Sequence, residues 1–111
     1  MSNWRVEVWG LALGEVKALP EDIRARFRRM TMLIESNGLE RLREPYVKHI
    51  DDKLWEMRLS GRDGIARTFY FAASGRRVVV VRAFVKKTQK TPRSEIALAN
   101  KRMKDWHDEQ G

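Results

Sequence analysis

Apolar and charged residues alternate from Trp4 to Trp9, and this period of two predicts a short strand. Apolar residues then recur at helical spacing, first briefly over residues 11–19 and then in a stronger stripe of Ile23, Phe27, Met30 and Ile34. Pro20 suits the first turn of the second helix, and Asn37-Gly38 suits its end. We therefore expect a helical hairpin, or one helix broken near Pro20.

Three strand-like segments follow closely on one another: Leu54–Leu59, Ile65–Ala72 and Val78–Lys86. Turn residues separate them, at positions 60–64 and at Ser74-Gly75. Connections this short permit only hairpins, so the three segments predict an antiparallel meander. Residues 39–53, which contain Pro45, are expected to form a mixed connector before it.

A last helix is expected after the meander, with Thr91 as its cap and Pro92 at its first position. Apolar residues repeat along it at spacings of three, four and three: Ile96, Ala99, Met103 and Trp106. The order of elements predicts an α+β fold, formed as one small domain over residues 1–111. Its parts are an N-terminal strand, a helical hairpin, a three-stranded antiparallel meander and a C-terminal helix.

Composition removes several classes of chemistry. The 111 residues include no cysteine, which excludes disulfides, thiolate metal sites and cysteine nucleophiles. Only His49 and His107 offer imidazole, and no P-loop or dinucleotide-binding glycine motif is present, so we expect neither metal nor cofactor. The longest apolar block, Val78–Val81, is far shorter than the roughly 18 residues that cross a bilayer. We expect a cytoplasmic protein with no membrane partner.

The net charge of +8 comes from 23 basic and 15 acidic side chains, and the excess is concentrated in one segment. Residues 58–93 contain ten basic side chains and a single acidic one, Asp63. A segment of this kind attracts phosphates, acidic protein or anionic lipid. Charge alone leaves these three partner classes open.

The sharpest candidate site is the segment Phe84–Arg93, which carries four cations: Lys86, Lys87, Lys90 and Arg93. These cations and the N–H groups of a helix start could bind phosphate together, although a solvated basic loop has the same composition. Arg58 and Arg67 lie in neighbouring predicted strands, and hairpin pairing would bring them onto one face. Arg82 is a further candidate whose register stays open.

Acid–base candidates are fewer. Glu56 has the carboxylate that a general base needs, but an exposed strand carboxylate at this position requires no special role. The four tryptophans are expected to pack in the core or at its edge rather than to stack on bases. Any enzyme built from these residues relies mostly on arginine and lysine, which suits the stabilisation of negative charge on a phosphoryl centre.

Three segments together carry a family resemblance: Leu54-Trp55-Glu56-Met57-Arg58, then Ala66-Arg67-Thr68-Phe69-Tyr70, then the loop Lys86–Pro92 with the following Arg93-Ser94-Glu95. Their order along the chain resembles the RelE/ParE toxin superfamily, and within it the HigB-like toxins and their phage-derived relatives. The resemblance covers nearly the whole chain. It implies a RelE-like fold and a toxin of a type II toxin–antitoxin pair.

RelE-like and HigB-like toxins enter the ribosomal A site and cut the mRNA there, by attack of a ribose 2′-OH on the adjacent phosphate. By this resemblance Arg67 and Lys90 are catalytic cations. The resemblance does not identify the proton acceptor, for which Glu56 and Lys87 are our candidates. Contacts with the RNA are implied for Arg58, Arg82, Lys86 and Arg93. The chain departs from RelE in having Leu54 and Glu56 in place of strand lysines, and Ala97 in place of a helix tyrosine.

The implied partners are a cognate antitoxin of the helix-turn-helix, HigA-like kind, the ribosome and mRNA. Operator DNA would be reached only through the antitoxin. Two alternatives stay open beside the ribosome-dependent endoribonuclease. One is a ParE-like toxin that binds DNA gyrase without enzymatic activity, and the other is an inactive phage-derived relative.

Overall fold

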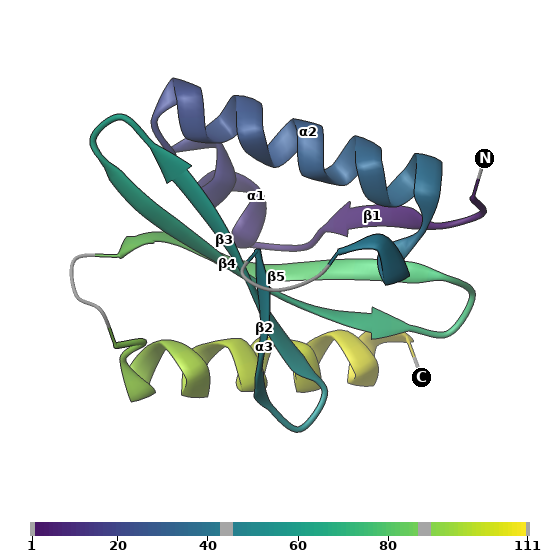
Figure 1. Ribbon diagram of the computed structural model, residues 1–111. Helices are drawn as coiled ribbons and strands as arrows, with labels where there is room; N and C mark the ends of the chain where they lie inside the picture. The colour runs from purple at the N-terminus through teal and green to yellow at the C-terminus, as the bar shows by residue number, and fades with distance from the viewer. Residues whose placement is uncertain (1, 43–45, 87–89, 111) are drawn as a thin grey trace.

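A twisted five-stranded sheet forms the centre of the protein in the computed structural model, with helices on both of its faces (Figure 1). The structure describes residues 2–42, 46–86 and 90–110. In chain order the elements are β1 (Arg5–Val8), α1 (Ala12–Lys17), α2 (Glu21–Asn37), a 3₁₀ turn η1 (Leu39–Arg41), β2 (Val47–Asp51), β3 (Leu54–Gly61), β4 (Gly64–Ala73), β5 (Arg77–Lys86) and α3 (Arg93–Gln110). The α+β prediction is therefore confirmed.

The strand order is β1-β5-β4-β3-β2. Strands β3, β4 and β5 form the predicted antiparallel meander. Strand β1 joins the far edge parallel to β5, in a register that sets Val6 beside Val78. A parallel partner must be reached through a crossover, which α1, α2 and the meander supply here.

The meander has one strand more than predicted, because β2 lies inside the expected connector. It pairs antiparallel with β3, with Val47 opposite Met57 and Lys48 opposite Glu56. Only Val47 in this strand is buried, and its other apolar residue, Ile50, packs against the opposite core, so the strand shows no apolar alternation in the sequence. The expectation of a connector over residues 39–53 was therefore wrong for residues 47–51.

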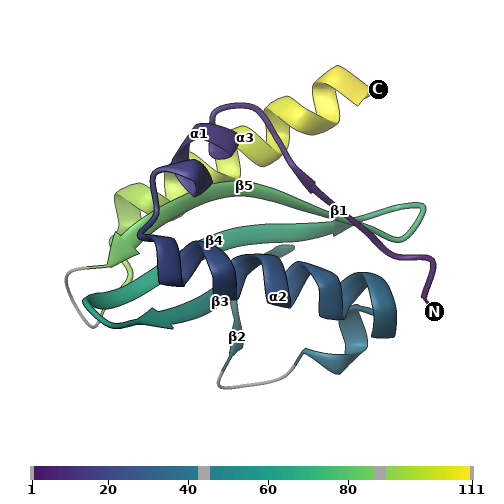
Figure 2. The same cartoon turned by 90° about the horizontal axis from the view of Figure 1, so that it is seen from above.

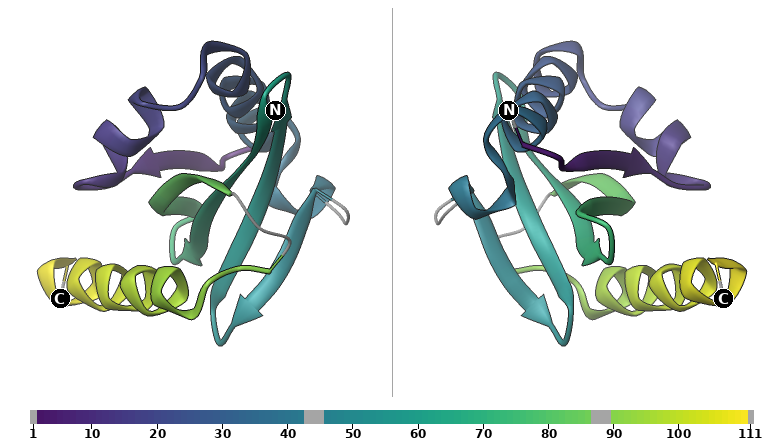
Figure 3. Two further views of the ribbon diagram at one scale, coloured as in Figure 1. Left: turned by 90° about the vertical axis from the view of Figure 1, so that its left-hand side faces the viewer. Right: turned by 90° about the vertical axis from the view of Figure 1, so that its right-hand side faces the viewer.

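Helices α1 and α2 cover one face of the sheet, and α3 covers the other (Figures 2 and 3). Each face has its own apolar core. Ile23, Phe27 and Ile34 of α2 pack with one set of strand residues, and Ala99 and Trp106 of α3 pack with the other set. Successive side chains of β5 point alternately into the two cores. Every position of Val78–Val81 is therefore buried, which explains why this run is apolar throughout.

The start of α3 differs from its prediction. The helix begins at Arg93, and the carbonyl of Pro92 accepts the N–H of Glu95. Thr91 was expected to cap this helix, but its hydroxyl instead donates a 2.7 Å hydrogen bond to Glu56 on β3. Throughout the part of the chain that the structure describes, no helix is long and apolar enough to span a membrane.

We predict that Gly61→Ala lowers the free energy of unfolding by about 1–3 kcal/mol, because it overpacks the contact between β3 and α2. A Cβ atom at Gly61 would stand 2.8 Å from Oδ2 of Asp22 and closer still to the side chain of Ile23. The same Asp22 oxygen accepts the backbone N–H of Arg62 at 2.6 Å, so the carboxylate is held in place. Urea unfolding measures the loss.

Gly14→Ala is the matched control, because a Cβ atom at Gly14 meets nothing within 4 Å. Gly14 lies inside α1, where alanine is the better helix former, so this variant should be neutral or up to about 1 kcal/mol more stable. Equal stability of Gly61→Ala and the unaltered protein would contradict the tight packing at the end of β3.

Candidate active site

A buried carboxylate lies where β3 faces the start of α3. Glu56 is 1% exposed, which corrects the expectation of an exposed strand carboxylate. Strand pairing sets it opposite Lys48 of β2 on one side and Phe69 of β4 on the other. A buried ionised group needs partners, and those of Glu56 are cations and one hydroxyl.

Arg67 is the most deeply buried of these cations, with 3% of the residue exposed. Its Nε lies 3.5 Å from Oε1 of Glu56, and neither Nε nor Nη1 has a hydrogen-bond partner among the described residues. Burial lowers the pKa of Arg67, and so does the charge of Arg58, while Glu56 opposes the shift. A buried guanidinium with unpartnered donors is suited to bind the oxygens of an anionic ligand.

Arg58 stands directly opposite Arg67 in the β3–β4 pairing, as the predicted hairpin requires. Its Nε lies 3.9 Å from Oε2 of Glu56, while 40% of its side chain is exposed. Two like charges directly opposite each other destabilise a strand pair. Glu56 lies beside both arginines and offsets this repulsion.

Two lysines complete the group of cations. Lys86, at the end of β5, is half-buried, and burial together with the charges of Arg67, Arg58 and Lys48 lowers its pKa, against the opposing charge of Glu56. Lys48 was missed by sequence reasoning because β2 was missed. We call Lys48, Arg58, Arg67 and Lys86 the cationic cluster; its members come from all four strands β2 to β5.

The segment before α3 closes the site. The hydroxyl of Thr91 donates to Oε1 of Glu56 at 2.7 Å, so this segment is tied to β3. Lys90 and Arg93, both predicted from the sequence, flank Thr91 closely in the chain and are exposed. Lys87, the other candidate proton acceptor, lies outside the described residues.

Arg82 is not part of this group. Its guanidinium makes a bidentate pair with Glu95 of α3, at 2.7 and 2.9 Å, and a third contact of 2.9 Å with Glu15 of α1. Glu15 also accepts a 2.8 Å hydrogen bond from Arg102, which donates in addition to the carbonyl of Val81. The pairs raise the pKa of Arg82 and link α1, β5 and α3.

We predict that Arg82→Met lowers the free energy of unfolding by about 1–3 kcal/mol, because it leaves Glu15 and Glu95 partly buried with fewer donors. Chemical denaturation measures the change. Lys101→Met is the control, since Lys101 forms an exposed pair with Asp105 and should change stability by less than about 1 kcal/mol. Equal effects of the two substitutions would rule out a structural role for the Arg82 pairs.

The cationic cluster and Glu56 combine two chemical abilities. A carboxylate can accept a proton, and guanidinium and ammonium groups around it can bind a phosphate and stabilise added negative charge. Among residues 2–42, 46–86 and 90–110, no group of three or more histidines or carboxylates is arranged to hold a metal ion. The arrangement supports phosphodiester chemistry by proton transfer and charge stabilisation.

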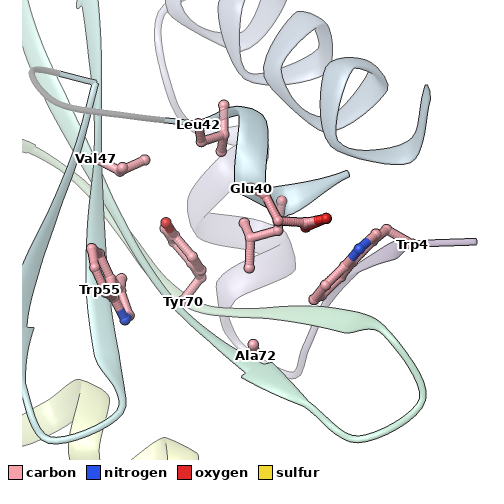
Figure 4. A pocket seen from close by; sticks show the side chains of 8 residues that line it. Trp4, Glu40, Leu42, Val47, Trp55, Tyr70 and Ala72 are labelled. Carbon is pink, nitrogen blue, oxygen red and sulfur yellow. The ribbon is translucent and has the colours of Figure 1, made fainter. Parts of the chain in front are cut away.

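A separate hollow lies on the other face of the sheet (Figure 4). Its volume is about 340 Å³, and Trp4 and Trp55 stand at its opposite ends with Tyr70 between them. Burial raises the pKa of Tyr70, so its hydroxyl stays neutral. Among the described residues of its lining, Glu40 alone is charged, which makes this pocket unsuited to a phosphodiester.

Comparisons with known proteins agree with the fold. The family model described as "Phage derived protein Gp49-like" matches residues 14–104. A mutant of the Escherichia coli toxin RelE in the free state superposes with a TM-score of 0.66 at 16% identity, covering 91% of this chain and 98% of that chain. The archaeal RelE–RelB complex from Pyrococcus horikoshii gives 0.57 at 18% identity, covering 78% and 98%.

No curated protein matches the sequence significantly. The two solved structures share the fold with this chain at low identity. Together with the family match, they confirm the RelE-like fold and the kinship with phage-derived proteins that the sequence motifs indicated. Because the family model spans most of the sequence, the chain belongs to the Gp49-like family of phage-derived proteins, with the fold of RelE.

Proposed function

We propose that this protein is the toxin of a type II toxin–antitoxin pair and that it cuts mRNA on the ribosome as an endoribonuclease. The observation that carries the proposal is the buried Arg67, whose Nε lies 3.5 Å from a buried carboxylate and whose Nε and Nη1 have no hydrogen-bond partner among the described residues. Family membership and the fold of RelE support the toxin assignment. The excess of cations between residues 58 and 93 supports RNA as the substrate.

The proposed reaction is an internal transfer of the phosphodiester. Glu56 takes the proton of a ribose 2′-OH, the 2′-oxygen forms a bond to the adjacent phosphorus, and the bond from phosphorus to the 5′-oxygen breaks. Arg67 donates to the non-bridging oxygens, where negative charge grows in the transition state. Lys86, with its lowered pKa, gives a proton to the leaving 5′-oxygen. The products are a 2′,3′-cyclic phosphate and a 5′-hydroxyl.

The remaining cations hold the RNA chain in this proposal. Lys48 and Arg58 flank Glu56 on the sheet, and Lys90 and Arg93 flank Thr91 beside it. Lys87 belongs to the same basic segment in the sequence and is assigned to RNA contact with them. Arg82 is left out, because its donors are engaged by Glu15 and Glu95.

The proposed partners are a cognate antitoxin, mRNA and the ribosomal A site, all in the cytoplasm. A RelE–RelB complex with the same fold supports the antitoxin. We assign to the antitoxin a HigA-like, helix-turn-helix architecture, through which operator DNA would be bound. Co-purification of the neighbouring open reading frame's product with this chain tests the pairing.

The deciding experiment is the mapping of new mRNA 5′ ends within minutes of induction, with the Arg67→Ala variant alongside. Cuts confined to translated regions, in codon register and absent in the variant, are the expected result. Arrested cells without new cuts would contradict the nuclease assignment and favour a bound target such as DNA gyrase. Harmless expression of the unaltered protein would indicate an inactive relative.

A further inference from the structure

A groove of about 250 Å³ runs between α2 and the end of β3, beside the candidate active site. Among the residues that the structure describes, its lining includes three arginines, Arg26 and Arg29 from α2 and Arg58 from β3, and no acidic side chain. Arg26 and Arg29 are three residues apart, so they share a face of the helix. Both are exposed, and no residue of the described chain forms an ion pair or hydrogen bond with either guanidinium.

Arg58 connects this groove with the candidate active site. It lines the groove and also reaches Glu56, with Nε 3.9 Å from Oε2. Its direct neighbour across the strand pairing is Arg67. The positive charge therefore continues from the buried Arg67, through the half-exposed Arg58, to the exposed arginines of α2.

An aromatic ring stands in the same groove. Tyr46 is 60% exposed, although its carbonyl is fixed by a 2.8 Å hydrogen bond from the backbone N–H of Arg58. The hydroxyl-bearing Ser60 lies in the lining as well. Cations that follow a backbone, combined with an aromatic ring that a base can stack on, are the features by which proteins bind single-stranded RNA.

We propose that this groove binds the mRNA strand beyond the cut site, with two phosphates at Arg26 and Arg29 and one base stacked on Tyr46. The inference rests on the proposed RNA cleavage for the identity of the strand. It adds a binding subsite to that function, on a helix that carries none of the candidate catalytic groups.

Binding of an uncleavable probe tests the groove independently of catalysis. The probe is a fluorescently labelled 12-nucleotide single strand with 2′-O-methyl groups throughout, and its affinity is measured against salt concentration. Arg26→Gln/Arg29→Gln should reduce the slope of log affinity against log salt by about 1.4, from two lost phosphate contacts. Tyr46→Ala should weaken binding about tenfold for any base sequence.

Arg5→Gln/Arg28→Gln is the charge-matched control, because both arginines are exposed and neither lines the groove. It should leave the slope nearly unchanged. An equal change in slope for the two double variants would overturn the proposal, because it would show that net charge alone decides the affinity. Circular dichroism and thermal unfolding confirm that each variant is folded.

Two further measurements distinguish mRNA from other possible ligands of the groove. In programmed ribosomes, 4-thiouridine placed in the mRNA should crosslink to the peptide that contains Tyr46; a crosslink to ribosomal RNA instead would overturn the assignment to mRNA. An unchanged salt slope together with lost neutralisation by the antitoxin would assign the groove to an acidic protein segment. The absence of new mRNA 5′ ends would contradict the proposed cleavage. An unchanged salt slope in Arg26→Gln/Arg29→Gln would contradict RNA binding in the groove.

Discussion

Arg67→Ala is expected to reduce RNA cleavage by about 100- to 1,000-fold, which is the usual effect of removing one group that stabilises developing charge. The buried guanidinium is held on β4, and two of its donors, Nε and Nη1, make no hydrogen bond to any described residue. Those donors are in place before the substrate arrives, so they need no reorganisation during the reaction. Single-turnover cleavage of a reporter mRNA on programmed ribosomes measures the loss.

Arg67→Lys separates charge from geometry. Lysine keeps the positive charge but lacks the planar fork that binds two phosphate oxygens at once, so most of the activity should be lost in this variant too. An exposed arginine away from the site, Arg76, supplies the control, and Arg76→Ala should cleave normally. Full activity of Arg67→Lys would show that charge alone is required.

At Arg67, the loss of RNA cleavage should not be accompanied by a large loss in the free energy of unfolding. Arg67→Met should be inactive, yet it should change the free energy of unfolding by less than about 2 kcal/mol, because the relief of two buried donors without hydrogen bonds offsets the loss of the 3.5 Å ion pair with buried Glu56. A large loss of stability in Arg67→Met would instead indicate that Arg67 holds the sheet together.

Much of the fold follows from local patterns in the sequence. Alternation and short turns predict the hairpins β3–β4 and β4–β5, and the stripe of Ile23, Phe27 and Ile34 predicts α2. Strand β2 escapes prediction because only Val47 of its five residues is buried. The parallel pairing of β1 with β5 joins segments some 70 residues apart, and no local pattern encodes it.

The sequence predicts the part of the candidate site that lies within the single hairpin β3–β4. Arg58 and Arg67 face each other because the β3–β4 turn fixes their register. The burial of Glu56 depends on Thr91, 35 residues further along the chain, and on the position of α3. The engagement of Arg82 likewise depends on Glu15, which belongs to a helix at the opposite end of the sequence.

The position of α3 is decisive for the site because it brings Thr91 to Glu56. Two sets of contacts outside the site hold this helix on the sheet. Arg82 of β5 pairs with Glu95 in the first turn of α3, and Arg102 in its middle pairs with Glu15 of α1. The indole of Trp106 donates to Glu7 of β1 at 3.2 Å. Residues that seem remote from the chemistry therefore determine whether the carboxylate is enclosed.

Glu56→Gln is expected to lower kcat by about 100- to 10,000-fold with little change in KM, because the proton acceptor is lost while the shape is kept. The amide oxygen of glutamine can still accept the hydroxyl of Thr91, which now reaches Oε1 at 2.7 Å. The cationic cluster remains to bind the substrate. Single-turnover rates at saturating enzyme and the half-saturating concentration give the two quantities separately.

Thr91→Val makes the matching control, since valine has nearly the shape of threonine but leaves the carboxylate without this donor. One hydrogen bond to a charged group contributes about 1.5–3 kcal/mol, so positioning alone accounts for at most about a 150-fold loss. A loss in Glu56→Gln well above that in Thr91→Val supports proton transfer by Glu56. Equal losses would make Glu56 a positioning residue for Arg67, and the proton acceptor would then have to be another group at the mouth of the site.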